Sequence, residues 1–339
     1  MDTMKIVLPM AGFGTRMRPH TWSKPKPLVS VAGKPSLEHL MDLLKALQGS
    51  ENNEYIFIVS PNLGESQIPA FVKENFPNIK ANFVVQREMK GQSHAIWLAR
   101  EHLQGPLFIS FSDTLIESDF SFLEKDQSDG IVWVMPVPDP RRFGVVQIRE
   151  GRWIERFIEK PSTFENNLAV VGYYYLKSSE SLLYAIEQQM KKKAMLKGEY
   201  FLADAISIMI ENGAKIRIHQ ARNWLDTGTI EATLATNRFM LERLHVETLE
   251  RETVKILPPV FIHDSAEISN STIGPYASIG AGCVIRDSKI EDSILEPGVE
   301  VDAAALTHSL IGKQAKVRGR GADGPAAELN VGDDSTVKF

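Results

Sequence analysis

The sequence is poor in cysteine, with Cys283 alone among 339 residues. A single cysteine excludes an intrachain disulfide and is typical of proteins that work in a reducing compartment, so we expect a cytoplasmic protein. Long apolar runs are also missing. The run at residues 4–10 is too short for a signal peptide, and no later stretch approaches eighteen consecutive apolar residues. We therefore expect neither export nor insertion into a membrane.

Positive charge is in slight deficit, because 38 Lys and Arg face 43 Asp and Glu, giving a net charge of −5. This sign argues against nucleic acid or an anionic membrane as a partner. Apolar residues make up 43% and charged residues 24% of the chain, which excludes a disordered or collagen-like protein. The length favours two domains.

The charge balance is reversed near the start of the chain. Residues 3–37 contain no acidic residue, but they contain six cations: Lys5, Arg16, Arg18, Lys24, Lys26 and Lys34. They surround a glycine turn, Gly12-Phe13-Gly14, that follows a predicted strand. Glycines at the carboxyl end of a strand let backbone N–H groups approach a phosphate, and Arg and Lys supply charge for it. A chance basic patch is the alternative, although this position is typical of ligand sites in open α/β sheets.

Two common phosphate-binding motifs do not fit this turn. A dinucleotide-binding fingerprint requires a third glycine where Met17 stands, and a Walker A loop requires a Gly-Lys-Ser/Thr sequence that is missing after Gly14. We therefore predict a polyphosphate ligand, although neither motif identifies which one.

Up to about residue 245, strand-like apolar runs alternate with helical patterns, which predicts a three-layer α/β fold. Strands are predicted at residues 5–9, 55–60, 107–111 and 130–134, and an amphipathic strand at 153–158. Helices are predicted from Ser36 to Gly49, after Gly91, and from Thr229 to about His245.

Beyond about residue 255, aliphatic residues recur every five or six positions, separated by Gly, Ala, Ser, Pro and Asp. They are Ile262, Ile268, Ile273, Ile279, Ile285, Ile290, Leu295, Val301, Leu306, Ile311 and Val317. This hexapeptide period is typical of a β-helix, in which the aliphatics stack inside short coils. An irregular Gly-rich β-sandwich is the alternative. The period is lost from Arg318 onward, which predicts a cap or tail.

The segment Gly12-Phe13-Gly14-Thr15-Arg16-Met17-Arg18-Pro19, with Lys24-Pro25-Lys26-Pro27-Leu28-Val29 and Val31-Ala32-Gly33-Lys34-Pro35, resembles the signature of sugar-1-phosphate nucleotidyltransferases. Residues 167–172, 224–228 and 331–335 are similar to the long form of glucose-1-phosphate thymidylyltransferase. The resemblance implies a Rossmann-like nucleotidyltransferase domain over residues 1–245. A left-handed β-helix with a C-terminal tail would follow over residues 246–339.

The resemblance also implies Mg²⁺, held by Asp113 and Asp226. Taken alone, Asp113 could be an ordinary turn residue and Asp226 the cap of the helix beginning near Thr229. The same resemblance assigns Arg16 to the leaving pyrophosphate, Lys26 to the α-phosphate and Lys160 to the attacking sugar phosphate.

Further binding residues follow from the resemblance. Those implied for the nucleotide are Leu8, Ala11, Gly12, Gly14, Thr15, Arg16, Gln86 and Gly91. Those implied for the sugar phosphate are Gly144, Glu159, Lys160, Val170, Gly172 and Glu199. Asp204, in Gly198-Glu199-Tyr200-Phe201-Leu202-Ala203-Asp204, is assigned to the fold. Ser112-Asp113-Thr114 departs from the family's Gly-Asp-Asn, and Met89 and Gln92-Ser93 depart near the base, so the base is less certain than the reaction.

The expected reaction joins dTTP and glucose 1-phosphate. UTP with glucose 1-phosphate and GTP with mannose 1-phosphate are the alternatives, and a silent paralogue that binds nucleotide sugar is a third. For the β-helix we expect assembly, as in a homo-oligomer, or regulation. An acyltransferase activity based on His263 or His308 rests on fold analogy alone.

Overall fold

The computed structural model describes residues 3–47, 52–244 and 253–339. By its internal contacts the chain divides into two units. The first comprises Met1–Gly12 and Leu40–Trp224, and the second comprises Phe13–His39 and Leu225–Phe339. The boundary predicted at residue 245 lies outside the described residues. Segment 13–39 groups by contact with the C-terminal residues, whereas the resemblance implies that it belongs to the catalytic domain.

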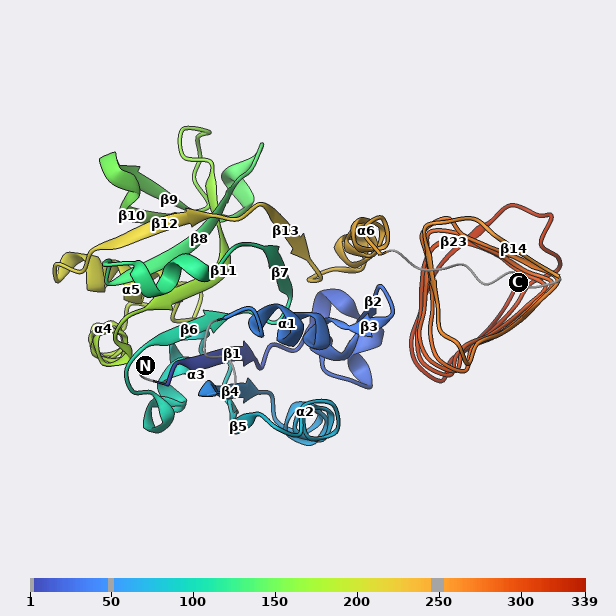
Figure 1. Ribbon diagram of the computed structural model, residues 1–339, viewed down its shortest axis with the longest axis horizontal. Helices are drawn as coiled ribbons and strands as arrows, with labels where there is room; N and C mark the ends of the chain where they lie inside the picture. The colour runs from blue at the N-terminus through green and yellow to red at the C-terminus, as the bar shows by residue number, and fades with distance from the viewer. Residues whose placement is uncertain (1–2, 48–51, 245–252) are drawn as a thin grey trace. The chain divides into compact units, whose positions relative to one another are not determined.

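The first unit is built on a nine-stranded mixed sheet, ordered β5-β4-β1-β6-β11-β8-β12-β10-β9 (Figure 1). The strands β1, β4, β5 and β6 are parallel, whereas β11 runs antiparallel to both β6 and β8. Their bounds are β1 (Lys5–Met10), β4 (Glu54–Val59), β5 (Lys80–Val85), β6 (Leu107–Ser110), β8 (Gly130–Pro136), β9 (Gly144–Arg149), β10 (Trp153–Glu159), β11 (Leu168–Leu176) and β12 (Ile216–Gln220). The predicted strands are confirmed, but the sheet is mixed rather than wholly parallel.

Both faces of β1 are buried, as its continuous apolar sequence predicted. Val7 belongs to a core cluster with residues of α3 (Gln92–Leu98), α4 (Ser179–Lys191) and α5 (Leu202–Glu211). Ile6 and Leu8, on the opposite face, are also fully buried. Because strands covered on both faces lose all their apolar surface to the core, the sequence reads as an unbroken apolar run. The helix α2 (Leu63–Asn75) packs beside β4 and β5.

The second unit contains stacked coils of short parallel strands over residues 254–338, which Figure 1 shows as three-sided turns. One row holds β14 (Val254–Ile256), β17 (Ser271–Ile273), β20 (Lys289–Ile290), β23 (Ala305–Ile311) and β25 (Ala327–Val331). A second joins β15 (Val260–Ile262), β18 (Ala277–Ile279) and β21 (Ile294–Leu295) to β23. A third holds β16 (Glu267–Ser269), β19 (Val284–Arg286), β22 (Glu300–Asp302), β24 (Lys316–Arg318) and β26 (Thr336–Lys338).

The predicted aliphatic period builds the interior of these coils. Of its eleven residues, all but Ile262 and Ile268 are buried. One coil spans 17 residues at first, as Val254 pairs with Ser271, and 16 later, as Val284 pairs with Glu300. We call residues 254–339 the coil region.

The prediction of a cap or tail after Arg318 is corrected by the structure. Leu306 pairs with Ala327 and Lys316 with Thr336, so β25 and β26 add another turn to the coils. The register there spans about four residues more than in the preceding turns, because extra residues are inserted between β24 and β25. The insertion hid the period without ending the coil.

The second unit also contains the segment 13–39 and the helix α6 (Ile230–Leu241). We call residues 13–39 the signature segment. It holds η1 (Thr15–Met17), η2 (His20–Trp22), η3 (Lys26–Leu28), β2 (Ser30–Val31), β3 (Lys34–Pro35) and the start of α1 (Ser36–Leu44). Met17 and Val29 of this segment share a buried apolar cluster with Leu234 of α6 and with Ile294 and Leu310 of the coil region.

The remaining elements are short. They are η5 (Arg100–His102), β7 (Thr114–Glu117), η6 (Ser121–Lys125), η7 (Pro140–Arg142), η8 (Glu150–Arg152) and β13 (Asn223–Asp226), which pairs with β7. No helix among the described residues is long and apolar enough to span a membrane.

Candidate active site

The glycine turn after β1 contains one residue in the left-handed region of backbone conformation. Gly14 has φ +60°, and a Cβ built on it would lie 2.9 Å from Cγ2 of Thr21. The Thr21 hydroxyl donates to the Gly14 carbonyl oxygen at 2.9 Å. Arg16 is exposed, and Cβ of Lys26 lies 3.2 Å from the built Cβ of Gly14. The second unit therefore brings Gly14 and Lys26 together, with Thr15 and Arg16 in η1.

The six cations near the start of the chain do not form one phosphate site. Lys5 pairs with Glu54, and Lys34 with Glu38 at 3.1 Å. Lys24 is buried against Glu296 and Asp333 of the coil region. The prediction of one basic cluster is wrong for these three, because each is neutralised by a carboxylate outside the acid-free stretch. Arg16 and Lys26 are the members to which the resemblance assigns phosphate contacts.

Asp226 lies at the end of β13, close to Arg16. Its Oδ1 accepts a hydrogen bond from the Gly228 backbone N–H at 2.6 Å. A Cβ built on Gly228 would lie 2.7 Å from that oxygen and 3.5 Å from Nη2 of Arg16. Thr229, not Asp226, caps α6, since its hydroxyl accepts from Ala232 N–H at 3.2 Å. The capping alternative for Asp226 is thus removed, and the carboxylate stands beside a guanidinium.

Asp113 belongs to the first unit, in the turn between β6 and β7. This turn is held to β11: Phe111 N–H donates to the Gly172 carbonyl at 3.2 Å, and the Tyr173 hydroxyl donates to the Thr114 carbonyl at 2.7 Å. The side chain of Asp113 is half-buried. Among the described residues there is no group of three His, Cys, Asp or Glu that could hold a metal ion.

The predicted base-binding residues lie between β5 and α3. Gln86 is 4% exposed, and its amide nitrogen contacts the Gly91 carbonyl at 3.1 Å and Nδ1 of His94 at 3.2 Å. Gly91 has φ +94°, and a Cβ there would lie 2.6 Å from the backbone N and O of Tyr200. Glycine at position 91 is thus required by the backbone of residues 199–200, independently of any nucleotide.

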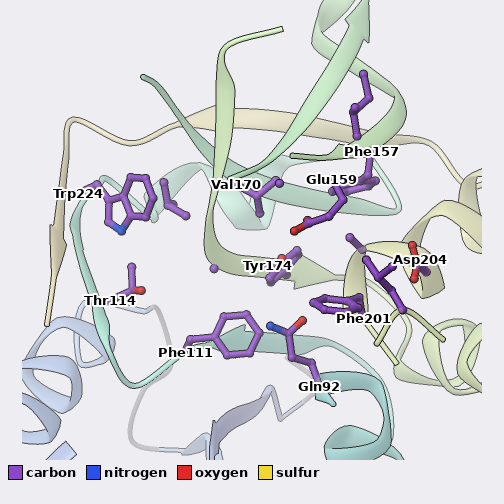
Figure 2. Close-up of a pocket in the computed structure, with 16 residues that line it drawn as sticks. Gln92, Phe111, Thr114, Phe157, Glu159, Val170, Tyr174, Phe201, Asp204 and Trp224 are labelled. Atoms are coloured by element: carbon purple, nitrogen blue, oxygen red, sulfur yellow. The ribbon is translucent and has the colours of Figure 1, made fainter. Parts of the chain in front are cut away.

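Four of the predicted sugar-phosphate residues line one pocket of the first unit, with a volume of about 290 Å³: Gly144, Glu159, Val170 and Gly172. Figure 2 shows the Glu159 carboxylate pointing into it toward Tyr174. A Cβ on Gly144 would lie 2.9 Å from Oε2 of Glu159, and one on Gly172 would lie 2.7 Å from the Phe111 ring. Gly144 therefore leaves space beside the carboxylate, and Gly172 lets the Phe111 ring approach β11 closely.

Two predicted residues lie outside the lining of this pocket. Lys160 follows Glu159 directly at the end of β10, is exposed and has φ +46°. Its N–H donates to the Phe143 carbonyl at 3.0 Å. Glu199 is exposed in the turn that pairs it with Leu196, and Leu196 does line the pocket.

The pocket also includes residues that were not predicted to bind the sugar phosphate. They are Gln92, Phe111, Thr114, Phe157, Ile158, Val171, Tyr174, Leu196, Phe201, Ala203, Asp204 and Trp224. Asp204 is the main omission, because it is a second acidic residue in the lining of this pocket. Its place in the sequence Gly-Glu-x-x-x-x-Asp was the available signal. The rings of Phe111 and Trp224 line the side of the pocket away from Asp204, and Tyr174 lies beside the Glu159 carboxylate (Figure 2).

The two histidines of the coil region have local partners. His308 contacts Asp292 through Nδ1 at 2.9 Å and Glu231 through Nε2 at 3.0 Å, and both carboxylates raise its pKa. Nδ1 of His263 contacts the Ser265 hydroxyl at 2.9 Å.

Comparison with known proteins places the chain in a family. The nucleotidyl transferase family model matches residues 5–243. A glucose-1-phosphate thymidylyltransferase of Streptomyces antibioticus is 29% identical over 365 residues, covering 99% of each chain. A protein of Oryza sativa subsp. japonica assigned as mannose-1-phosphate guanylyltransferase 3 is 29% identical over 334 residues, covering 93% of this chain and 87% of its own.

A solved structure shares the fold. A Bacillus anthracis protein crystallised with sucrose, provisionally assigned as a glucose-1-phosphate thymidylyltransferase, superposes with a TM-score of 0.61 at 22% identity. The match covers 73% of this chain and 98% of that one. With the family match over residues 5–243, these similarities show that the chain is a nucleotidyltransferase of the nucleotidyl transferase family.

Proposed function

We propose that the protein transfers a thymidylyl group from dTTP to glucose 1-phosphate. A phosphate oxygen of the sugar phosphate attacks the α-phosphorus, a new P–O bond forms, and the bond to the β-phosphate breaks. The products are dTDP-glucose and pyrophosphate. No covalent enzyme intermediate is needed, so the protein has to align the two substrates and neutralise their charge.

The pocket of the first unit is the observation that carries this proposal. Its volume of about 290 Å³ is at the lower end of the range for small-ligand sites. The Glu159 carboxylate accepts sugar hydroxyls there, while the aromatic rings of the pocket contact the face of the sugar ring. We assign Lys160, the next residue, to the sugar's phosphate group. Val170 and Gly172 line the pocket from β11.

Triphosphate binding is assigned to the turn after β1. Leu8 and Ala11 form its buried base, and Gly12, Gly14 and Thr15 present backbone groups to the phosphates. Arg16 binds the departing pyrophosphate and Lys26 the α-phosphate. Support comes from Gly12, where a Cβ would meet no atom within 4 Å, so that the turn leaves open space beside the chain.

Asp113 and Asp226 would hold Mg²⁺ beside the substrate phosphates, because carboxylate oxygens are the hard ligands that this ion prefers. Two protein carboxylates, rather than three, are typical of that arrangement. When bound, Mg²⁺ neutralises phosphate charge.

The choice of base rests on similarity to thymidylyltransferases along the whole chain. Gln86 and Gly91 are the residues proposed to contact the base and ribose, and the buried amide of Gln86 would have to exchange its present partners to do so. UTP with glucose 1-phosphate is the second candidate. GTP with mannose 1-phosphate is the third, supported by the rice relative.

We further propose that the coil region is a left-handed β-helix of hexapeptide repeats, and that the protein forms a homo-oligomer in the cytoplasm. The rows of short parallel strands with buried aliphatics support the first point. The buried thiol of Cys283, whose pKa burial raises to about 11, suits a reducing compartment because it is shielded and protonated.

A pyrophosphate-release assay tests the reaction. Wild-type protein would be assayed with Mg²⁺ and each pairing of dTTP, UTP and GTP with glucose 1-phosphate and mannose 1-phosphate. We expect the highest kcat/KM for dTTP with glucose 1-phosphate. A higher value for another pairing would reassign the substrates. If no pairing gave pyrophosphate, the silent paralogue would be favoured. Glu159→Gln serves as the variant with a weakened sugar site.

A further inference from the structure

We propose that the coil region positions the phosphate-binding turn, and that Lys24, Glu296 and Asp333 are the positioning residues that connect them. This rests on the proposed function in that Arg16 and Lys26 are taken as the phosphate contacts. It also gives a role to Val331-Gly332-Asp333-Asp334-Ser335, a motif that the transfer reaction does not use.

The connection is a buried ion network. Nζ of Lys24 pairs with Oε2 of Glu296 and lies 3.2 Å from Oδ1 of Asp333. The three side chains are only 10%, 3% and 9% exposed, respectively. Charges so far from water persist only when they are paired, and removal of one member leaves its partners uncompensated. The signature segment is therefore strongly tied to the coil region at Lys24.

Each carboxylate also binds a second group of the segment. Oε1 of Glu296 accepts the Ser30 backbone N–H at 2.7 Å, and Oδ2 of Asp333 accepts the Ser23 hydroxyl at 2.6 Å. Oδ1 of Asp333 is itself fixed by the Lys313 backbone N–H at 2.8 Å. Lys26 lies between Lys24 and Ser30, so Glu296 holds the chain on both sides of it.

A second attachment joins the coil region to the signature segment shortly after Arg16. Nδ2 of Asn330 donates to the Arg18 carbonyl at 3.3 Å, and its Oδ1 contacts Nε2 of His20 at 2.7 Å. His20 is fully buried, and burial lowers its pKa. A Cβ on Gly332 would lie 3.1 Å from Cβ of Pro19, so glycine permits this close approach.

A third attachment runs through α6, the helix that follows Asp226. Oδ1 of the fully buried Asn237 accepts the Ala32 backbone N–H at 2.9 Å and the Ser278 hydroxyl at 2.7 Å. Its Nδ2 donates to the Tyr276 carbonyl at 3.1 Å. One amide thus joins the segment, the helix and the coils.

These attachments matter because the segment has little regular structure of its own. It contains three 3₁₀ turns and two strands of two residues each. A catalytic group that shifts by about 1 Å can lose about a hundredfold in rate. The coil region therefore supplies the rigidity that Arg16 and Lys26 need. A loosened ion network should lower kcat/KM for the triphosphate more than it affects the sugar phosphate.

The test compares Glu296→Gln and Asp333→Asn with wild type in the full-length protein. Both variants keep side-chain shape and remove charge. We expect kcat/KM for the triphosphate to fall ten- to a hundredfold, while KM for the sugar phosphate changes by less than about twofold. We also expect faster amide hydrogen exchange over residues 13–31. Glu300→Gln is the control, because Glu300 pairs with Lys316 at 2.9 Å on the same coils but is 45% exposed.

Exchange and triphosphate kinetics like those of wild type, in folded variants, would overturn the proposal. So would equal losses for both substrates that only track a lower thermal midpoint. If either charged variant does not fold, Asn330→Ala loosens the attachment at Arg18 without exposing a buried charge, and the same criteria apply. Wild-type protein that releases no pyrophosphate would refute the proposed function, and the exchange experiment would still decide whether the coils hold the segment.

Discussion

The two units hold their functional residues in different ways. In the first unit the proposed sugar pocket is lined by residues of β9, β10 and β11, strands of one sheet, together with residues of α3 and α5. In the second unit the proposed triphosphate contacts lie on a segment with almost no regular structure, which ions and amides fix to the coil region. A sheet positions side chains through its own ladder of hydrogen bonds, whereas an irregular segment requires neighbours to do so. Substitutions should therefore affect the two substrates separately.

The largest loss of activity is expected from substitutions of the proposed metal ligand Asp113 and the proposed sugar-phosphate ligand Lys160. Asp113→Ala and Lys160→Ala should each lower kcat/KM by about a thousandfold or more, because charge stabilisation in the transition state is lost. Pyrophosphate release measures the loss, and circular dichroism should show an unchanged fold. Glu150→Ala, at an exposed acid in η8, is the control. Full activity of either variant would refute the role assigned to that residue.

Two glycines separate a structural requirement from a functional one. Gly91→Ala should lower the free energy of unfolding by about 2 kcal/mol, because a side chain at φ +94° is strained and its Cβ would meet the Tyr200 backbone. Gly12→Ala should change stability by less than about 0.5 kcal/mol, since nothing lies within 4 Å of its Cβ. Urea denaturation of both variants measures the difference, and equal stabilities would contradict it.

The sugar pocket offers a substitution that affects one substrate. Glu159→Gln should raise KM for glucose 1-phosphate about tenfold, because hydrogen bonds to a charged acceptor contribute about 1.5–3 kcal/mol and the amide is a weaker acceptor. KM for dTTP should remain within about twofold of wild type. Initial-rate measurements with each substrate varied in turn provide the check. A parallel rise in both constants would mean that the pocket is not specific to the sugar.

A smaller effect is expected from His308, which joins α6 to the coils. Asp292 and Glu231 raise the pKa of His308, and Arg238 also pairs with Asp292. Because the folded pKa lies above the unfolded value near 6.5, the stabilisation is complete below about pH 6.5 and is lost as the pH rises through the folded pKa. It should amount to less than about 1 kcal/mol.

Thermal midpoints measured between pH 5.5 and 9 test this. The difference between wild type and His308→Gln should shrink as the pH increases. A difference that is constant or that grows with pH would contradict the assignment.

The sequence allowed the repeating parts of the fold to be predicted. Apolar runs located β1, β4, β6 and β8, and the aliphatic period located the coils, because burial imposes these patterns locally. The resemblance grouped Gly144, Glu159, Val170 and Gly172, which the structure brings into one pocket. The extra turn after Arg318 was missed, since an insertion interrupts its period.

Other features could not be read from the sequence because their partners are distant in the chain. Lys24 pairs with Glu296, which lies 272 positions later in the sequence. The sequence suggests that Lys24 contributes to a phosphate site, whereas the structure shows it in an internal ion pair. The sequence assigns Asp204 to the fold, and only the approach of α5 to β10 brings it to the pocket. Charges give no periodic signal, so their pairing requires the folded structure.

The most direct test of the central claim is phosphorus NMR of wild-type protein with Mg²⁺, dTTP and glucose 1-phosphate. The account predicts that the resonances of both substrates decline together and are replaced by equal amounts of dTDP-glucose and pyrophosphate. A spectrum that stays unchanged, or dTTP cleavage that proceeds equally without the sugar phosphate, would contradict it.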